Sequence, residues 1–172
     1  MSQSTLQAAG LSGMAPASRH TSDIPGAMAH WGALLLRIAL GWGFLMHGYA
    51  KLSRGPETFS VVLHTLGVPA PFLFAWLTTV VELIGGLALV VGAFVPIVSI
   101  PLAVVLLVAL FKVHLPYGFF SVKLAEVSAN GTKFGTVGYE IIVMYLGGLA
   151  ALALGGAGRL SIDHWRKMRR AS

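Results

Sequence analysis

The sequence predicts an all-α integral membrane protein, folded as a four-helix bundle. Hydrophobic residues make up 56% of the 172-residue chain, and mean hydropathy is +0.79. Charged residues make up only 10%, whereas a soluble domain carries about a quarter. Four apolar stretches also reach the roughly 20 residues that cross a hydrocarbon core of about 30 Å. In lipid such stretches must be helical, because unpaired backbone groups are too costly there.

The predicted spans follow from the limits of these apolar stretches. The second and third spans are almost contiguous, so we expect a tight hairpin between them. The loop after the first span contains "TFSVVLHTLG", which we interpret as a short interfacial helix, and the loop 116–135 is expected to be irregular. The four spans cover approximately Trp31–Leu52, Pro71–Gly92, Phe94–Leu115 and Thr136–Gly156.

The flanking segments predict the organisation and orientation of the chain. Residues 29–160 form the membrane domain, between a flexible tail at 1–28 and a basic tail at 161–172. Lysine and arginine concentrate on the cytoplasmic side of membrane proteins. The tail side carries Arg19, Arg159, Arg166, Lys167, Arg169 and Arg170, against Arg54, Lys123 and Lys133 in the first and third loops. We therefore expect a bacterial inner-membrane protein with both termini in the cytoplasm.

Composition also restricts the chemistry and the partners. The chain has no cysteine, which excludes disulfides, thiol catalysis and cysteine-ligated clusters. Its net charge of +6 is ordinary for a membrane protein with basic flanks, so the expected partner is the lipid bilayer and no nucleic acid. The first 28 residues lack the continuous apolar core of a signal peptide.

Ionisable residues inside the predicted spans are the candidates for function. Each costs at least about 2.5 kcal/mol near the bilayer centre, so such residues are usually paired or functional. At about 100° per residue, the polar positions of the first span share one stripe with small and aromatic residues. That stripe consists of Arg37, Gly41, Phe44, His47, Gly48 and Lys51.

Depth along the spans predicts two polar groups. Arg37 and Glu82 are expected to form a structural ion pair. His47, Lys51, His114 and Glu140, with Lys112 at a similar depth, are expected to gather in the outer half as a ligand or proton site. For these residues a structural His47–Glu140 hydrogen bond and a lysine reaching the interface stay open as alternatives. We expect no metal site, because the lysines would repel a cation.

Glycine pairs in the spans predict close helix packing. Small residues let membrane helices approach one another. The packing positions are Gly41, Gly48, Gly85, Gly86, Gly147 and Gly148.

Four segments in this order resemble the DoxX family of small bacterial membrane proteins. They are "LRIALGWGFLMHGYAKL" (Leu36–Leu52), "VELIGGLALVVG" (Val81–Gly92), "GYE" (Gly138–Glu140) and "GGAGRLSID" (Gly155–Asp163). The resemblance implies a four-helix membrane bundle and kinship with the small subunit of an archaeal thiosulfate:quinone oxidoreductase. Its signature positions correspond to Arg37, His47, Gly48, Lys51, Glu82 and Glu140.

These observations predict the membrane subunit of a redox system, with a quinone or other lipophilic ligand in the outer half of the bundle. No flavin, haem or iron–sulfur motif is evident in the chain. Quinone is therefore the expected cofactor, and the electrons would come from a soluble redox partner protein. A non-catalytic scaffold that recruits a soluble enzyme is the alternative. A small transporter is a third interpretation, although no pair of broken helices points to alternating access.

Overall fold

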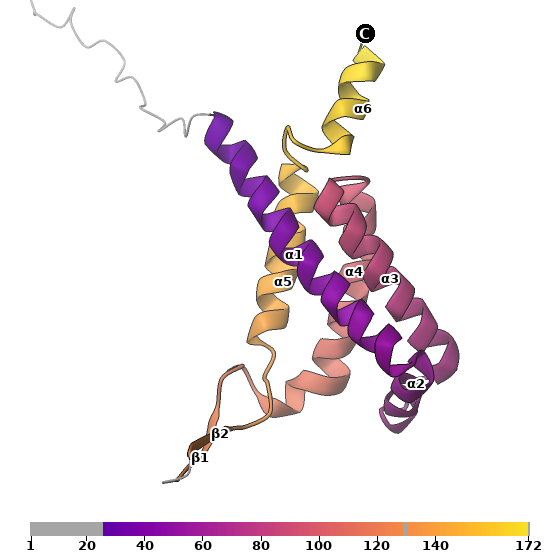
Figure 1. The fold of residues 1–172 in the computed structure, drawn as a ribbon, viewed down its shortest axis with the longest axis vertical. Coiled ribbons are helices and arrows are strands. Elements are labelled where there is room, and N and C mark those ends of the chain that lie inside the picture. The colour runs from indigo at the N-terminus through magenta and orange to yellow at the C-terminus, as the bar shows by residue number, and fades with distance from the viewer. Residues whose placement is uncertain (1–25, 129–130, 172) are drawn as a thin grey trace, which may run out of the picture.

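The structure, a computed structural model, describes residues 26–128 and 131–171, and is dominated by helices (Figure 1). Most of the predicted tail at 1–28 lies outside the described residues. Helix α1 (Gly26–Arg54) starts before the predicted first span and is followed at once by α2 (Pro56–Thr65). The helix expected after the first span is therefore present as α2.

Helices α3 (Pro71–Val91) and α4 (Val95–Ala109) form the expected tight hairpin. Gly92 ends α3 in the left-handed region, at φ 70°, a conformation that glycine adopts without steric penalty. Proline stands in the first turn of both helices, where its missing N–H has no helical partner to lose.

The end of the third predicted span is not regular α-helix. After α4 the chain makes a π-helical turn, η3 (Leu110–His114), and then a 3₁₀ turn, η4 (Leu115–Tyr117). A π turn accommodates an extra residue and changes which side chains face a neighbour. Lys112 and His114 both lie in this turn.

The loop predicted to be irregular contains an antiparallel hairpin, so that expectation was wrong. Strand β1 (Leu124–Ser128) pairs with β2 (Gly131–Phe134), and the register shifts between Leu124 and Glu126. Helix α5 (Glu140–Gly155) follows. The basic segment treated as a tail is also ordered, because Ile162–Ala171 forms helix α6.

Among the described residues, three helical stretches are long and apolar enough to cross a membrane: Trp31–Arg54, Pro71–Val91 and Val95–Tyr117. These confirm a helical membrane protein. Helix α5 is apolar, but its 16 residues give only about 24 Å at 1.5 Å per residue. It lies beside α1 and α4 (Figure 1). The fourth span therefore stays a prediction.

Helices α1 and α3 pack closely against each other through glycine. A Cβ on Gly86 would lie 2.8 Å from the carbonyl oxygen of Gly41, and a Cβ on Gly41 would lie 2.7 Å from that of Gly86. Gly48, Gly85 and Gly148 similarly face side chains of neighbouring helices, at 2.8–3.0 Å. Gly147 has no neighbouring atom within 4 Å, so the packing role predicted for it was wrong.

Candidate functional site

A cavity of about 990 Å³ opens between α1, α2, α3, α4 and α5. Its walls are mainly aliphatic, with Leu77 and Val81 from α3 and Val104 and Val108 from α4 among the lining residues. Phe44 and Tyr145 also line it, with their rings edge to face at 5.4 Å. An apolar cavity of this size, between helices, is typical of sites for small lipophilic ligands.

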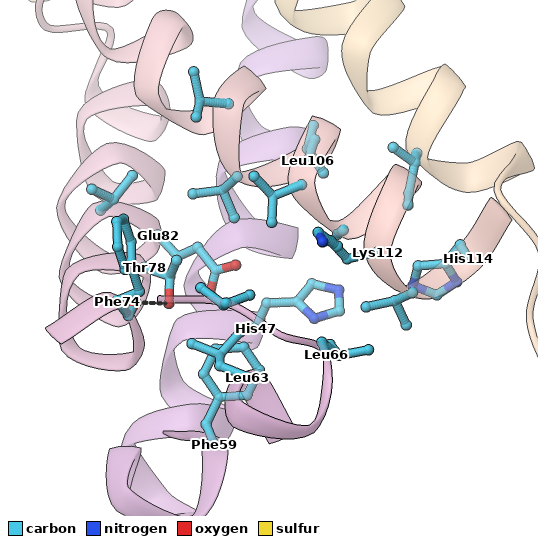
Figure 2. Close-up of a pocket in the computed structure, with 18 of the residues that line it drawn as sticks. His47, Phe59, Leu63, Leu66, Phe74, Thr78, Glu82, Leu106, Lys112 and His114 are labelled. Atoms are coloured by element: carbon cyan, nitrogen blue, oxygen red, sulfur yellow. Dashed lines mark hydrogen bonds between the residues drawn. The ribbon is translucent and has the colours of Figure 1, made fainter. Parts of the chain in front are cut away.

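One part of the cavity is polar (Figure 2). His47 and Lys51 come from α1, Glu82 from α3, and Lys112 and His114 from the π turn. In Figure 2 the ring of His47 points into the cavity, on the side where Lys112 and His114 lie. With the histidines neutral, these five residues carry one net positive charge, so this part of the cavity suits an acceptor or an anion.

Lys51 and Glu82 form a partly buried ion pair. The Nζ of Lys51 lies 2.5 Å from Oε1 of Glu82 and also contacts Oε2. The exposed fraction of the Glu82 side chain is 6% and that of Lys51 is 18%. Lys51 also lies 4.9 Å from the centre of the Phe59 ring, a cation–π contact. The pair neutralises both charges and fixes α1 against α3.

The other polar groups of the cavity differ in their bonding. The Nδ1 of His114 lies 2.9 Å from the carbonyl oxygen of Val137. This contact engages one of the two ring nitrogens, and the other is Nε2. Neither His47 nor Lys112 has a hydrogen-bond or ion-pair partner among residues 26–128 and 131–171, and both side chains are exposed at the cavity. These two residues are therefore available to a ligand.

Glu140 is not part of this group, so the predicted His47–Glu140 pair was wrong. Its Oε2 accepts a hydrogen bond from the backbone N–H of Ser121 at 3.0 Å. In return, Ser121 Oγ accepts from the N–H of Ile141 at 3.3 Å. Ser121 Oγ thereby satisfies one free backbone donor at the start of α5. The Glu140 carboxylate in turn anchors the preceding loop at Ser121.

The predicted Arg37–Glu82 ion pair was also wrong. Arg37 is fully buried, and its Nη2 donates to the carbonyl oxygen of Leu160 at 2.6 Å. Its Nε and Nη1 have no partner among the described residues. Depth along parallel helices does not predict this contact, because the acceptor is a backbone carbonyl of the segment that follows α5.

Some lining residues of the site carry no strong sequence signal. No local pattern marks the π turn that places Lys112 at the cavity, so only its depth in the third predicted span points to it. Phe59 and Leu63 of α2 line the cavity as well. The helical spacing of apolar residues in "TFSVVLHTLG" is the signal that could have identified them. Within the described ranges, no three histidine or acidic side chains lie together as a metal site would require.

A comparison with protein families matches the DoxX model to residues 32–115. The match includes His47, Lys51, Glu82, Lys112 and His114, and ends before α5. No match was found among curated proteins or solved structures.

Proposed function

Because the chain belongs to the DoxX family over residues 32–115, we propose that it is the membrane subunit of a redox system, with a quinone-type ligand in the cavity. A soluble partner protein supplies the electrons. The protein resides in the bacterial inner membrane with both termini in the cytoplasm. One observation carries the proposal. An apolar cavity in a membrane protein brings to the same polar end two donor side chains, His47 and Lys112, that have no partner within the described part of the chain.

The lining of the cavity supports a ligand with a polar head and a long apolar tail. The aliphatic walls of α3 and α4 favour an isoprenoid or acyl chain, since burying apolar surface is favourable wherever water is displaced. A quinone head has two carbonyl oxygens, which accept hydrogen bonds and donate none. The ammonium of Lys112 has three donors and no acceptor, so it matches such a head.

Reduction of a quinone consumes two protons and leaves negative charge to be stabilised as electrons arrive. Lys112 provides a positive charge that such a ligand oxygen would meet in a medium of low dielectric constant, where it acts strongly. The imidazole of His47 has one ring nitrogen that can donate a proton and one that can accept it. The ammonium of Lys51 is engaged by Glu82, so we assign the stabilising charge to Lys112.

The test is direct binding of a short-chain ubiquinone or menaquinone analogue to the full chain in lipid nanodiscs. Lys112→Met removes the donor and retains much of the side-chain volume, and we expect it to weaken binding about tenfold, the loss of one charge-assisted hydrogen bond. His47→Leu should weaken binding similarly. Lys133→Met is the matched control, since Lys133 lies on β2 and pairs with Glu126 outside the cavity.

Two results would contradict the proposal. Wild-type protein that binds no quinone analogue would remove it. Equal binding by Lys112→Met, His47→Leu and the Lys133→Met control would show that quinone is held elsewhere.

A further inference from the structure

Helix α6 is fixed to the membrane helices at its first turn. Asp163 accepts the backbone N–H groups of Phe94 and Val95 at 2.8 and 2.9 Å, which caps the start of α4. The N–H of Asp163 donates to the carbonyl oxygen of Gly92 at 3.0 Å. Just before α6, the Nη2 of Arg37 donates to the carbonyl oxygen of Leu160. The helix therefore has a fixed origin at the turn between α3 and α4.

Helix α6 has an apolar side and a basic side. At 100° per residue, Ile162, Trp165 and Met168 fall on one side of the helix, and Arg166, Lys167 and Arg170 fall on the other. Arg169 lies within the apolar arc, with its guanidinium over the Trp165 ring at 3.6 Å. The three apolar side chains are exposed by 41%, 52% and 61%. The helix also carries four basic residues, Arg166, Lys167, Arg169 and Arg170, against one acidic residue, Asp163. Since the carboxylate of Asp163 is engaged at α4, its charge does little to offset the basic face.

The position of α6 puts its first turn near the edge of the bilayer. It lies at the same end of the molecule as the first turns of α1, opposite α2 (Figure 1). The first candidate span begins at Trp31, which is 57% exposed. Tryptophan is enriched at the interface between lipid and water. The level of this interface therefore passes close to α6.

We propose that α6 binds the anionic lipid surface, with Trp165 and Met168 against the acyl boundary and its basic residues at the headgroups. Short helices with an aromatic or aliphatic face and a Lys/Arg-rich face bind membranes in this way. Anionic headgroups supply the negative charges that would pair with the basic residues of α6. A second copy of α6 would instead bring like charges together. This lipid contact is separate from the cavity and does not depend on the proposed quinone function.

The absence of cysteine allows a clean experiment on the full chain. Met168→Cys and Lys167→Cys each place one nitroxide label, on the apolar and the basic face respectively. The proteins are reconstituted in vesicles of phosphatidylcholine, with or without phosphatidylglycerol. In the anionic vesicles we expect the label at 168 to be protected from a water-soluble relaxation agent severalfold more than the label at 167. High salt should reduce the difference, because it screens charge.

A charge variant supplies the second arm. Lys167→Gln with Arg170→Gln, combined with Met168→Cys, should lose the protection in anionic vesicles. Equal exposure of the 167 and 168 labels in anionic vesicles would overturn the proposal. So would equal protection of the 168 label in vesicles of phosphatidylcholine alone and in anionic vesicles, because the basic face would then contribute nothing to the lipid contact. Protection that persists in the charge variant would exclude the role of anionic headgroups.

Discussion

At the scale of single residues, the Lys51–Glu82 pair is the main buried charge contact of the described chain. Glu82 lies within the second long apolar helix, where an unpaired carboxylate would be costly. Lys51 meets this requirement from the end of α1, and the ring of Phe59 lies against its ammonium. The pair is therefore expected to matter for stability, whereas His47 and Lys112 are expected to matter for binding.

We predict that Lys51→Met destabilises the protein by about 3–5 kcal/mol, because it leaves the Glu82 charge buried without a partner. Unfolding in mixed detergent micelles measures the effect. The control is Lys133→Met, which breaks an exposed pair with Glu126 and should cost less than about 1 kcal/mol. Equal losses of stability in the two variants would show that the buried pair stabilises the protein no more than the exposed pair does. The double variant Lys51→Met with Glu82→Leu should recover part of the lost stability.

The same residues show what the sequence predicts at this scale. The face of α1 follows directly from helical periodicity, and Arg37, Gly41, Phe44 and Gly48 are indeed buried. Partners are less predictable, because pairing depends on helix tilt and rotation as well as depth. Arg37 binds a backbone carbonyl 123 residues away, and every residue supplies such a carbonyl. Nothing in the residue types could have identified this acceptor.

At the scale of elements, the contact between α1 and α3 depends on the absence of side chains. Gly41 and Gly86 allow the two backbones to approach at a point where a Cβ on either would meet the other's carbonyl. Close backbone approach of this kind strengthens van der Waals packing, which drives helix association in lipid. It also sets the relative position of Lys51 and Glu82, since these residues lie on the same two helices.

We predict that Gly86→Ala costs about 1–3 kcal/mol, as overpacking of a well-filled contact does. The new methyl group would lie 2.8 Å from the Gly41 oxygen and 2.9 Å from the Leu45 nitrogen, and backbone atoms cannot move aside as a flexible side chain can. The measurement is unfolding in detergent. Gly147→Ala is the matched control, since its site is open, and it should be neutral or slightly stabilising through helix propensity. A Gly86→Ala variant as stable as this control would disprove the close contact.

The predictability of the elements follows the strength of the local signal. Long apolar runs located α1, α3 and α4, and the short separation of two runs located the hairpin. The π turn and the β-hairpin were missed, because neither has a strong local signature. The π turn nevertheless determines which residues of the third apolar helix reach the cavity, so the site could be only partly predicted.

At the scale of the whole molecule, the two ends differ in chemistry. The end with α6 is basic, and the opposite end carries α2 and the strands (Figure 1). The β-hairpin and α6 are separated along the chain by α5. Whether α5 spans the membrane therefore decides whether these two segments lie on opposite sides. Its length of about 24 Å falls short of the typical core, and local thinning of the bilayer can accommodate such a mismatch.

We predict that α5 does span, with α6 in the cytoplasm and the hairpin outside. An apolar helix beside α1 and α4 has its backbone hydrogen bonds satisfied, and thinning the bilayer around it costs little free energy. The basic residues of α6 favour the cytoplasmic side for the end of the molecule that carries α6. The measurement is labelling of Thr132→Cys and Lys167→Cys by an impermeant maleimide on spheroplasts. Cysteine at 132 should react at once and cysteine at 167 only after permeabilisation. Reaction of both from the same side would show that α5 does not cross, and the reverse pattern would show a crossing helix with the opposite orientation.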